Sequence, residues 1–320
     1  MKARGTEERT MRDAPRTVVL KLSNWRDFTK ALFILSKDTW LYRGQEDSEW
    51  RLQSSLEREM DERPIDDPQE LERDNIELFR ANSKLLGFNF DSDIETLVAM
   101  QHHEAKTRLL DFSTSLMVAL FFAYEKTYKE AKSRAIYAIN FKALCESDTL
   151  RTRYQMYAKQ RAMRRLLDDV IKMERMRYTL VEDVEFRRFI LHAANDAIKN
   201  GNGEDGVLPL YTAPMNKRQL AQAGTQLMPL SFGPFVNNLA AALRIGNTKE
   251  INSPSYVVKD ISHRHIDNVP SHIALIKMVF DKSMEKDAWD ILDQSNINPF
   301  TIYPDLIGLA KSMRYVKQFV

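Results

Sequence analysis

The sequence predicts an α+β protein with a mixed or antiparallel central sheet flanked by helices. Two observations support this class. Short apolar runs typical of strands and segments with helical spacing are both present, but they do not alternate as a doubly wound sheet requires. In addition, hydrophobic residues make up 43% of the 320 residues and charged residues 29%, which suits a chain with a substantial core.

Strands are expected where β-branched and aromatic residues gather in short apolar runs. The expected strands cover residues 17–22, 40–45, 135–141, 207–211, 225–229 and 272–280.

Helices are expected where apolar residues recur every three or four positions. Asn24 or Ser23 can cap the first helix, and Ser113 or Ser115 can cap an apolar run that is too short to cross a bilayer. The expected helices cover residues 25–36, 68–82, 93–102, 115–126, 286–293 and, with a turn, 297–311.

The organisation along the chain predicts one α+β domain over residues 17–320, preceded by a flexible arm over residues 1–16. The arm is rich in charged residues and has no apolar periodicity. Within the domain, a helical insertion is expected over residues 146–200, where Arg, Lys, Met and Leu recur with helical spacing.

The composition excludes several classes of protein. A net charge of +2 is too small to require a nucleic-acid partner. The single cysteine, Cys145, cannot form an internal disulfide or a multi-cysteine zinc site, and we expect it to be chemically inert. The polar start and the lack of a long apolar run predict a cytoplasmic protein with no membrane partner.

A first chemical motif stands at the end of an expected strand, where Tyr42, Arg43, Gly44 and Gln45 follow one another. Glycine permits a tight turn or a close approach of ligand to backbone, and arginine can bind a phosphate or carboxylate through two parallel hydrogen bonds. The structural alternative, compatible with this role, is an ion pair between Arg43 and a buried carboxylate such as Asp111.

A second motif, His102 and His103, ends an expected helix. Neighbouring imidazoles point in different directions, so one can line a cleft while the other packs or orients it. Histidine serves as donor, acceptor or general base near neutral pH. Two alternatives are a purely structural pair and a metal site with Asp111 and Glu104. No metal is expected, because the helical spacing of metal-binding histidines is absent.

Next to the histidines, Thr107, Arg108 and Asp111 are expected to form a tight turn before the buried helix. Asp111 would accept hydrogen bonds from the backbone or from Arg108. A carboxylate at this place would also lie near the positive end of the helix dipole.

Four separated segments follow one another in an informative order. They are 42–45 with Trp50, Leu52, Ser54, Ser55, Leu56 and Arg58; 101–112 with the apolar run 118–123; Arg218 with Gln222 and Gly224; and 303–310. In order and spacing they resemble the FRG family, named for its Phe/Tyr-Arg-Gly signature, over roughly residues 38–315. Glu104 and Lys106 depart from it, since a small residue and a proline are usual there.

The same residues show a weaker resemblance to ADP-ribosyltransferases, in which a strand-borne Arg-Gly holds NAD. This resemblance implies catalytic roles for Arg43, His102, His103 and Gln222, and NAD as a substrate. Gln222 would stabilise positive charge poorly, and Glu182 or Glu185 are substitutes. Ligand-binding roles are implied for Tyr42, Arg43, Gly44, Gln45, Thr107, Arg108 and Asp111.

Together these features lead to a functional hypothesis: an Arg/His-lined cleft that binds a nucleotide-type phosphorylated ligand. The protein would be an NAD-dependent transferase or an NAD-cleaving effector, and the occurrence of the family in bacteria and phages suits a role in phage–host conflict. The alternative is a module that binds a ligand, nucleic acid or a partner without chemistry.

The basic stretch 151–177 could serve that alternative. Arg153, Arg161, Arg164 and Arg165 could contact nucleic acid or an acidic protein partner, with Tyr154 and Tyr157 interleaved for stacking. The plainer interpretation is a solvated helical face whose Leu and Met residues pack inward. Self-association through residues 146–200 is a further hypothesis.

Overall fold

The structure is a computed structural model that describes residues 16–36, 39–126, 132–160, 184–201, 203–210, 217–258 and 273–316. Contacts within the chain divide it into two compact units. The first unit comprises Met1–Trp50, Ser115–Lys142 and Asn247–Asn298, and the second comprises Arg51–Thr114, Ala143–Gly246 and Pro299–Val320. The expected arm lies almost wholly outside the described residues, and a single domain over 17–320 stays a prediction.

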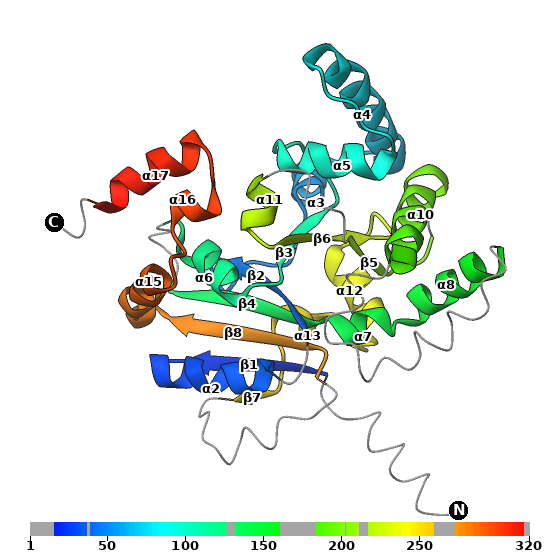
Figure 1. Cartoon of the computed structure of the whole chain (residues 1–320). Coiled ribbons are helices and arrows are strands. Elements are labelled where there is room, and N and C mark those ends of the chain that lie inside the picture. The colour runs from blue at the N-terminus through cyan, green and yellow to red at the C-terminus, as the bar shows by residue number, and fades with distance from the viewer. Residues whose placement is uncertain are drawn as a thin grey trace, which may run out of the picture. The chain divides into compact units, whose positions relative to one another are not determined.

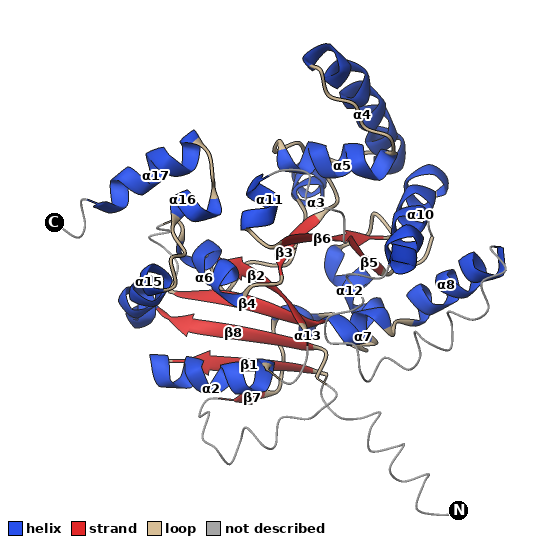
Figure 2. Cartoon of the chain, viewed as in Figure 1, coloured by secondary structure: helices blue, strands red, loops and turns tan. Residues whose placement is uncertain are grey.

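The strands of the first unit pair in the order β2-β4-β8-β1-β7 (Figure 2). Their bounds are β1 Thr17–Leu22, β2 Trp40–Gln45, β4 Ser133–Asn140, β7 Val257–Val258 and β8 Leu275–Asp281. β4 pairs antiparallel with both β2 and β8, whereas β1 pairs parallel with β8 and with β7. With helices packed against these strands, the α+β class and its mixed sheet are confirmed.

The first unit also contains helices, some of which pack against this sheet and others against a neighbouring helix. They are α2 Trp25–Leu35, α6 Leu116–Tyr124, α13 Lys249–Asn252, η3 Lys282–Met284 and α15 Glu285–Gln294. Both predicted caps are confirmed, because Asn24 accepts from the amide of Asp27 at 3.0 Å and Ser115 accepts from that of Val118 at 3.4 Å. Phe28 of α2 meets Phe280 of β8, with ring centroids 5.6 Å apart.

Gly44 allows α6 to pack directly on β2. A Cβ atom at Gly44 would collide with the carbonyl oxygen of Ala119 and lie 2.7 Å from the amide nitrogen of Ala123. Only glycine permits this distance between a strand and a helix backbone. Gly44 therefore has a packing role that is sufficient to explain its place in the motif.

The second unit contains strands in the order β5-β6-β3, all antiparallel. β5 is Val207–Leu210, β6 is Gly224–Pro229 and β3 is Leu110–Ser113. The expectation of a tight turn through Asp111 was wrong, because residues 110–113 form a strand. Leu110 and Phe112 are buried and Asp111 is exposed between them, so the side chains alternate as a strand requires.

Further described helices, labelled in Figure 1, fall within the residue ranges of the second unit. They are α3 Ser55–Glu62, α4 Pro68–Ser83, η1 Lys84–Leu86, α5 Asp93–His102, α8 Asp148–Gln160, α10 Val184–Asn200, α11 Lys217–Ala221, α12 Phe235–Leu243, α16 Pro299–Ile302 and α17 Leu306–Val316, and α7 Phe141–Cys145 crosses the division. In the insertion 146–200, the described residues from 148 onward are helical, as α8 and α10. Residues 161–183 lie outside the described part.

A buried asparagine organises the turn after β6. The side-chain oxygen of Asn238, on α12, accepts from the amides of Gly206, Leu230 and Ser231 at 3.0–3.1 Å. Asn238 is fully buried, so these bonds form in an environment where unpaired amides would be costly. The loop that follows β6 is thereby fixed to α12.

Among the described residues, no helix is long and apolar enough to cross a membrane.

Candidate functional site

A chain of side-chain hydrogen bonds positions Asp111 in the second unit. Gln101, at the end of α5, accepts from the hydroxyl of Thr107 and donates from Nε2 to Oδ2 of Asp111 at 2.6 Å. The amide of Thr107 in turn donates to the hydroxyl of Ser55 at 3.0 Å. Thr107 is buried, whereas the carboxylate that this chain orients belongs to an exposed residue. Thr107, predicted as a ligand-binding residue, thus contacts Gln101 and Ser55.

Gln226 of β6 lies directly opposite Asp111 of β3 in the antiparallel register. Its Nε2 atom donates to Oδ1 of Asp111 at 3.3 Å. Its Oε1 atom is buried and has no hydrogen-bond partner among the described residues. A buried acceptor left unpaired costs about 1–3 kcal/mol, so a donor from a ligand would be favourable at this point.

His102, also at the end of α5, is half-buried beside these groups. Partial burial lowers the pKa of His102, and the positive charges of His103 and Arg218 lower it further. Asp111 and Asp305 act in the opposite direction without reversing the shift. The lowered pKa favours a neutral imidazole at neutral pH, which can both donate and accept a hydrogen bond.

The two histidines serve different surroundings, as expected of neighbours at a helix end. Their rings meet edge to face, with centroids 5.0 Å apart. His103 lines an apolar cleft of about 630 Å³ between α3, α4 and α5, and His102 is not among the residues that line this cleft.

Arg218 of α11 brings a cation to the neighbourhood of His102. Its guanidinium carbon lies 4.4 Å from the centroid of the Tyr303 ring, a contact that favours a fixed orientation. The Nζ atom of Lys311 lies 4.1 Å from the centroid of the same ring. The third and fourth segments of the sequence pattern therefore meet at Tyr303.

Gln222, predicted as catalytic, lies in the turn between α11 and β6. Its Nε2 atom donates to the backbone carbonyl oxygen of Ile302 at 3.4 Å. The backbone carbonyl oxygen of Gln222 accepts from the hydroxyl of Ser113 at 2.8 Å. These bonds join β3, the turn and α16 within the second unit. They favour a positioning role for Gln222, and its catalytic role stays a prediction.

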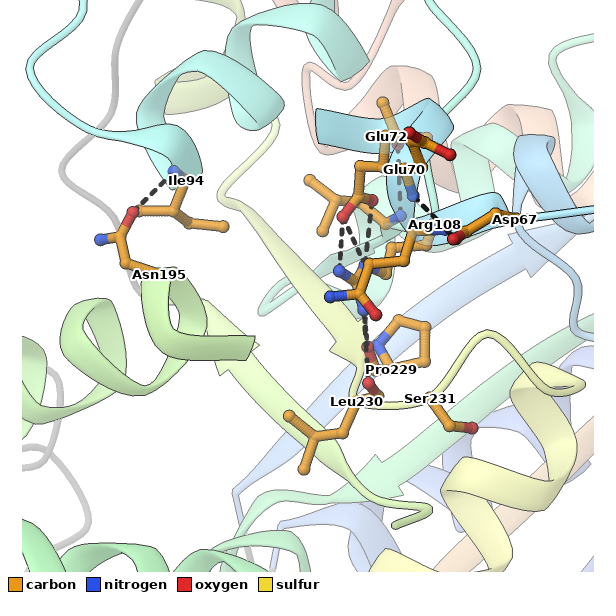
Figure 3. A network of polar contacts seen from close by, with 12 residues as sticks. Asp67, Glu70, Glu72, Ile94, Arg108, Asn195, Pro229, Leu230 and Ser231 are labelled. Atoms are coloured by element: carbon orange, nitrogen blue, oxygen red, sulfur yellow. Dashed lines mark hydrogen bonds and ion pairs between the residues drawn. The ribbon is translucent and has the colours of Figure 1, made fainter. Parts of the chain in front are cut away.

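Arg108 is buried in an ion pair with Glu72 of α4 (Figure 3). Its Nε donates to both oxygens of Glu72, at 2.9 and 3.1 Å, and its Nη1 donates to the carbonyls of Pro229 and Leu230 at 3.4 and 3.3 Å. Both side chains are 3% exposed, so this guanidinium does not face solvent. The geometry gives Arg108 a structural role, and its expected partner Asp111 is replaced by Glu72.

Arg43 lies in the first unit, on the opposite side of β2 from Gly44. It stands opposite Tyr137 of β4, and Tyr137 stands opposite Lys277 of β8, so the three side chains share one face of the sheet. Lys277 lies 5.3 Å from the Tyr137 ring centroid and donates to the carbonyl of Asn252 at 2.6 Å.

Two other residues of this motif are less accessible than Arg43. Tyr42 and Gln45 are buried, and burial raises the pKa of the Tyr42 hydroxyl to about 12. A pocket shared by Arg43 and the two histidines would join residues of different units, and it stays a prediction.

The residues predicted to contact nucleic acid are described only in part. Arg153 of α8 is half-buried and lies 3.8 Å from Asp196. Arg161, Arg164 and Arg165 lie outside the described residues. Tyr154 and Tyr157 are buried against Phe189, with centroids 5.0 and 5.6 Å away, so they are not available to stack on bases.

Two further features bear on chemistry. In the described part of the chain, no group of three or more His, Cys, Asp or Glu side chains could hold a metal ion. Cys145 is buried, and burial raises the pKa of its thiol, which disfavours the reactive thiolate.

The segment that begins just before β2 and ends after α6 matches a known family. Residues 38–132 match the model of the FRG domain. The chain contains an FRG domain. This domain includes Arg43, Gln101, His102 and Asp111, whereas Gln226 lies outside the matched residues. No curated protein and no solved structure matches the chain. None of these matches supports the resemblance to ADP-ribosyltransferases.

Proposed function

We propose that the second unit binds a nucleotide-type phosphorylated ligand at Asp111, Gln226, His102 and Arg218. The observation that carries this proposal is the buried Oε1 atom of Gln226, which has no partner in the described residues and lies beside an exposed carboxylate. A ligand with hydroxyl or amide donors would satisfy both groups at once.

The chemistry of a ribose phosphate suits these side chains. A carboxylate such as Asp111 can accept hydrogen bonds from the two hydroxyls of a ribose, as acidic residues do in dinucleotide sites. Arg218, already oriented by Tyr303, can bind a phosphate through its guanidinium. A neutral His102 can donate to the ligand or accept from it.

If the protein is an enzyme, NAD is the substrate that this arrangement of side chains favours. Cleavage of the bond between ribose and nicotinamide develops positive charge on the ribose, and water supplies the hydroxyl of the product ADP-ribose as nicotinamide and a proton leave. The Asp111 carboxylate would stabilise that positive charge better than the neutral amide of Gln222. A transferase differs only in replacing water with an acceptor group on another molecule.

The non-catalytic alternative predicts binding of the same ligands without nicotinamide release. Contact with nucleic acid through the basic stretch is less favoured, because Tyr154 and Tyr157 are buried. A role in phage–host conflict remains part of the proposal as a biological setting for an NAD-cleaving effector.

Isothermal titration calorimetry with ADP-ribose and NAD tests the binding claim. We expect saturable binding that weakens at least about tenfold in Asp111→Asn, because the amide loses the charge that attracts both ribose donors. Asp293→Asn, at an exposed position of α15, serves as the matched control and should bind like the wild type. Equal affinity for wild type and Asp111→Asn would refute the site.

A second measurement separates chemistry from binding. Nicotinamide release from NAD should be detectable with the wild type and lost in His102→Asn and Asp111→Asn. Binding without release in any condition would favour the non-catalytic module.

A further inference from the structure

We infer that the second unit carries another ligand site, which takes a molecule with an apolar body and one acidic group. The site is the apolar cleft of about 630 Å³, whose walls include Leu56, Leu71, Phe79, Phe88, Phe90 and Met100. Small-molecule sites in proteins are typically apolar hollows of about 300–1,000 Å³ with a few polar groups. This inference does not depend on the ligand proposed for Asp111.

The cleft keeps unusually large apolar side chains in contact with solvent. Leu86 is 76% exposed, Leu78 63% and Phe88 58%, and all three line the cleft. Exposed apolar surface gathered in one concave place is typical of a binding site, because burying it removes that surface from water. An apolar body in the cleft would gain this stabilisation.

Aromatic rings contribute much of the wall. Phe79 of α4 lies near Phe90, with ring centroids 6.0 Å apart and planes inclined by 34°. Phe88 lines the same hollow. A flat ring or an acyl chain of the ligand can therefore contact several ring faces.

The charges at the cleft decide the polarity of the ligand's remaining group. The cleft is lined by Arg63, His103 and Lys106 as basic residues and by Glu59 as the acidic one. Glu59 is already paired with Arg63 one turn along α3. Lys106 and His103 thus remain to face an acidic group, whereas a cationic amphiphile would have to compete with Arg63 for the carboxylate of Glu59.

Displacement of the fluorescent anion 8-anilinonaphthalene-1-sulfonate provides the assay, with three probes of equal chain length. Dodecanoate should displace the dye saturably, dodecanol more weakly, and dodecyltrimethylammonium least. Lys106→Glu should weaken dodecanoate binding roughly three- to tenfold, as expected for reversing an exposed charge beside an anion, and should leave dodecanol unchanged. Lys199→Glu, at an exposed position of α10, is the matched control.

Several results would overturn the inference. They are equal displacement by all three probes, non-saturable binding of dodecanoate, or an equal effect of Lys106→Glu and Lys199→Glu. Asp111→Asn should leave dodecanoate binding unchanged. If Asp111→Asn loses nucleotide binding but keeps dodecanoate binding, the two sites are independent of each other.

Discussion

At the scale of single residues, the proposed site depends on the carboxylate of Asp111. This carboxylate accepts from Gln101 and from Gln226, whereas the sequence predicted the backbone or Arg108 as its donor. Gln226 carried no signal of its own, because a lone glutamine in an apolar strand is read as part of the core. Only the antiparallel register places it opposite Asp111, which is 115 positions away along the chain.

Glu104 has a backbone conformation that is unfavourable for a residue with a side chain. It follows α5 with a φ angle of 65°, in the left-handed region that glycine adopts most readily. Because a side chain costs about 1 kcal/mol there, Glu104→Gly should raise the free energy of unfolding by roughly that amount. Glu104→Ala removes the charge but keeps the Cβ atom, so urea unfolding of both variants separates the two causes. An equal gain in both would contradict the backbone explanation.

His102 predicts a dependence of stability on pH. Its pKa is lowered in the folded chain, mainly by burial, so the unfolded chain takes up this proton more readily. The contribution of His102 to stability is therefore full above the unfolded pKa of about 6.5 and is lost as the pH falls through the folded pKa. His102→Asn should lose less stability than the wild type between pH 8 and pH 5, as measured by urea unfolding. Identical losses would show that His102 makes no such contribution.

At the scale of elements, the long periodic segments were predicted well. Strand β1 and helix α5 have the expected bounds, and α6 begins at the predicted cap Ser115. β3 was missed because it has only four residues and one of them is an exposed aspartate. α12 was missed as well, although it supplies the buried Asn238 that fixes the loop after β6. Short elements of this kind are stabilised by tertiary contacts that local patterns do not contain.

The packing of β2 against α6 yields a prediction for Gly44→Ala. The added methyl group would collide with the backbone of Ala119, so we expect a loss of about 1–3 kcal/mol or more in the free energy of unfolding. Gly246→Ala is a suitable control, since a Cβ atom there meets no atom within 4 Å. A Gly44→Ala protein with wild-type stability in urea would mean that the helix and strand can separate at little cost.

The buried pair of Glu72 and Arg108 joins α4 to the end of β6. Glu72→Gln leaves the guanidinium without its counter-charge and should cost about 3–5 kcal/mol in a urea unfolding experiment. Glu72→Leu combined with Arg108→Met should cost less than the sum of the two single changes, because both charges are then removed. Glu70→Gln, on the exposed side of the same helix, should change little. Additive losses in the double variant would argue against the pair as a unit.

At the scale of the whole molecule, the α+β class, the mixed sheet and the FRG domain followed from residue order and spacing. The grouping of site residues did not follow, since it depends on strand register and on contacts between distant segments. Glu72 and Gln226 illustrate this, because each meets its partner only once α4, β3 and β6 are assembled. The division into two units was likewise not evident from composition along the chain.

The most direct test of the proposed site is the affinity of Gln226→Met for ADP-ribose. The substitution keeps the size of the side chain and removes both the unpaired acceptor and the Nε2 donor to Asp111. Because Asp111 keeps its bond from Gln101, folding stability should change by less than about 1 kcal/mol. We expect calorimetry to show roughly tenfold weaker binding of ADP-ribose by Gln226→Met, and wild-type binding by the control Gln294→Met, at an exposed position of α15. Unchanged affinity in a folded Gln226→Met protein would contradict the account.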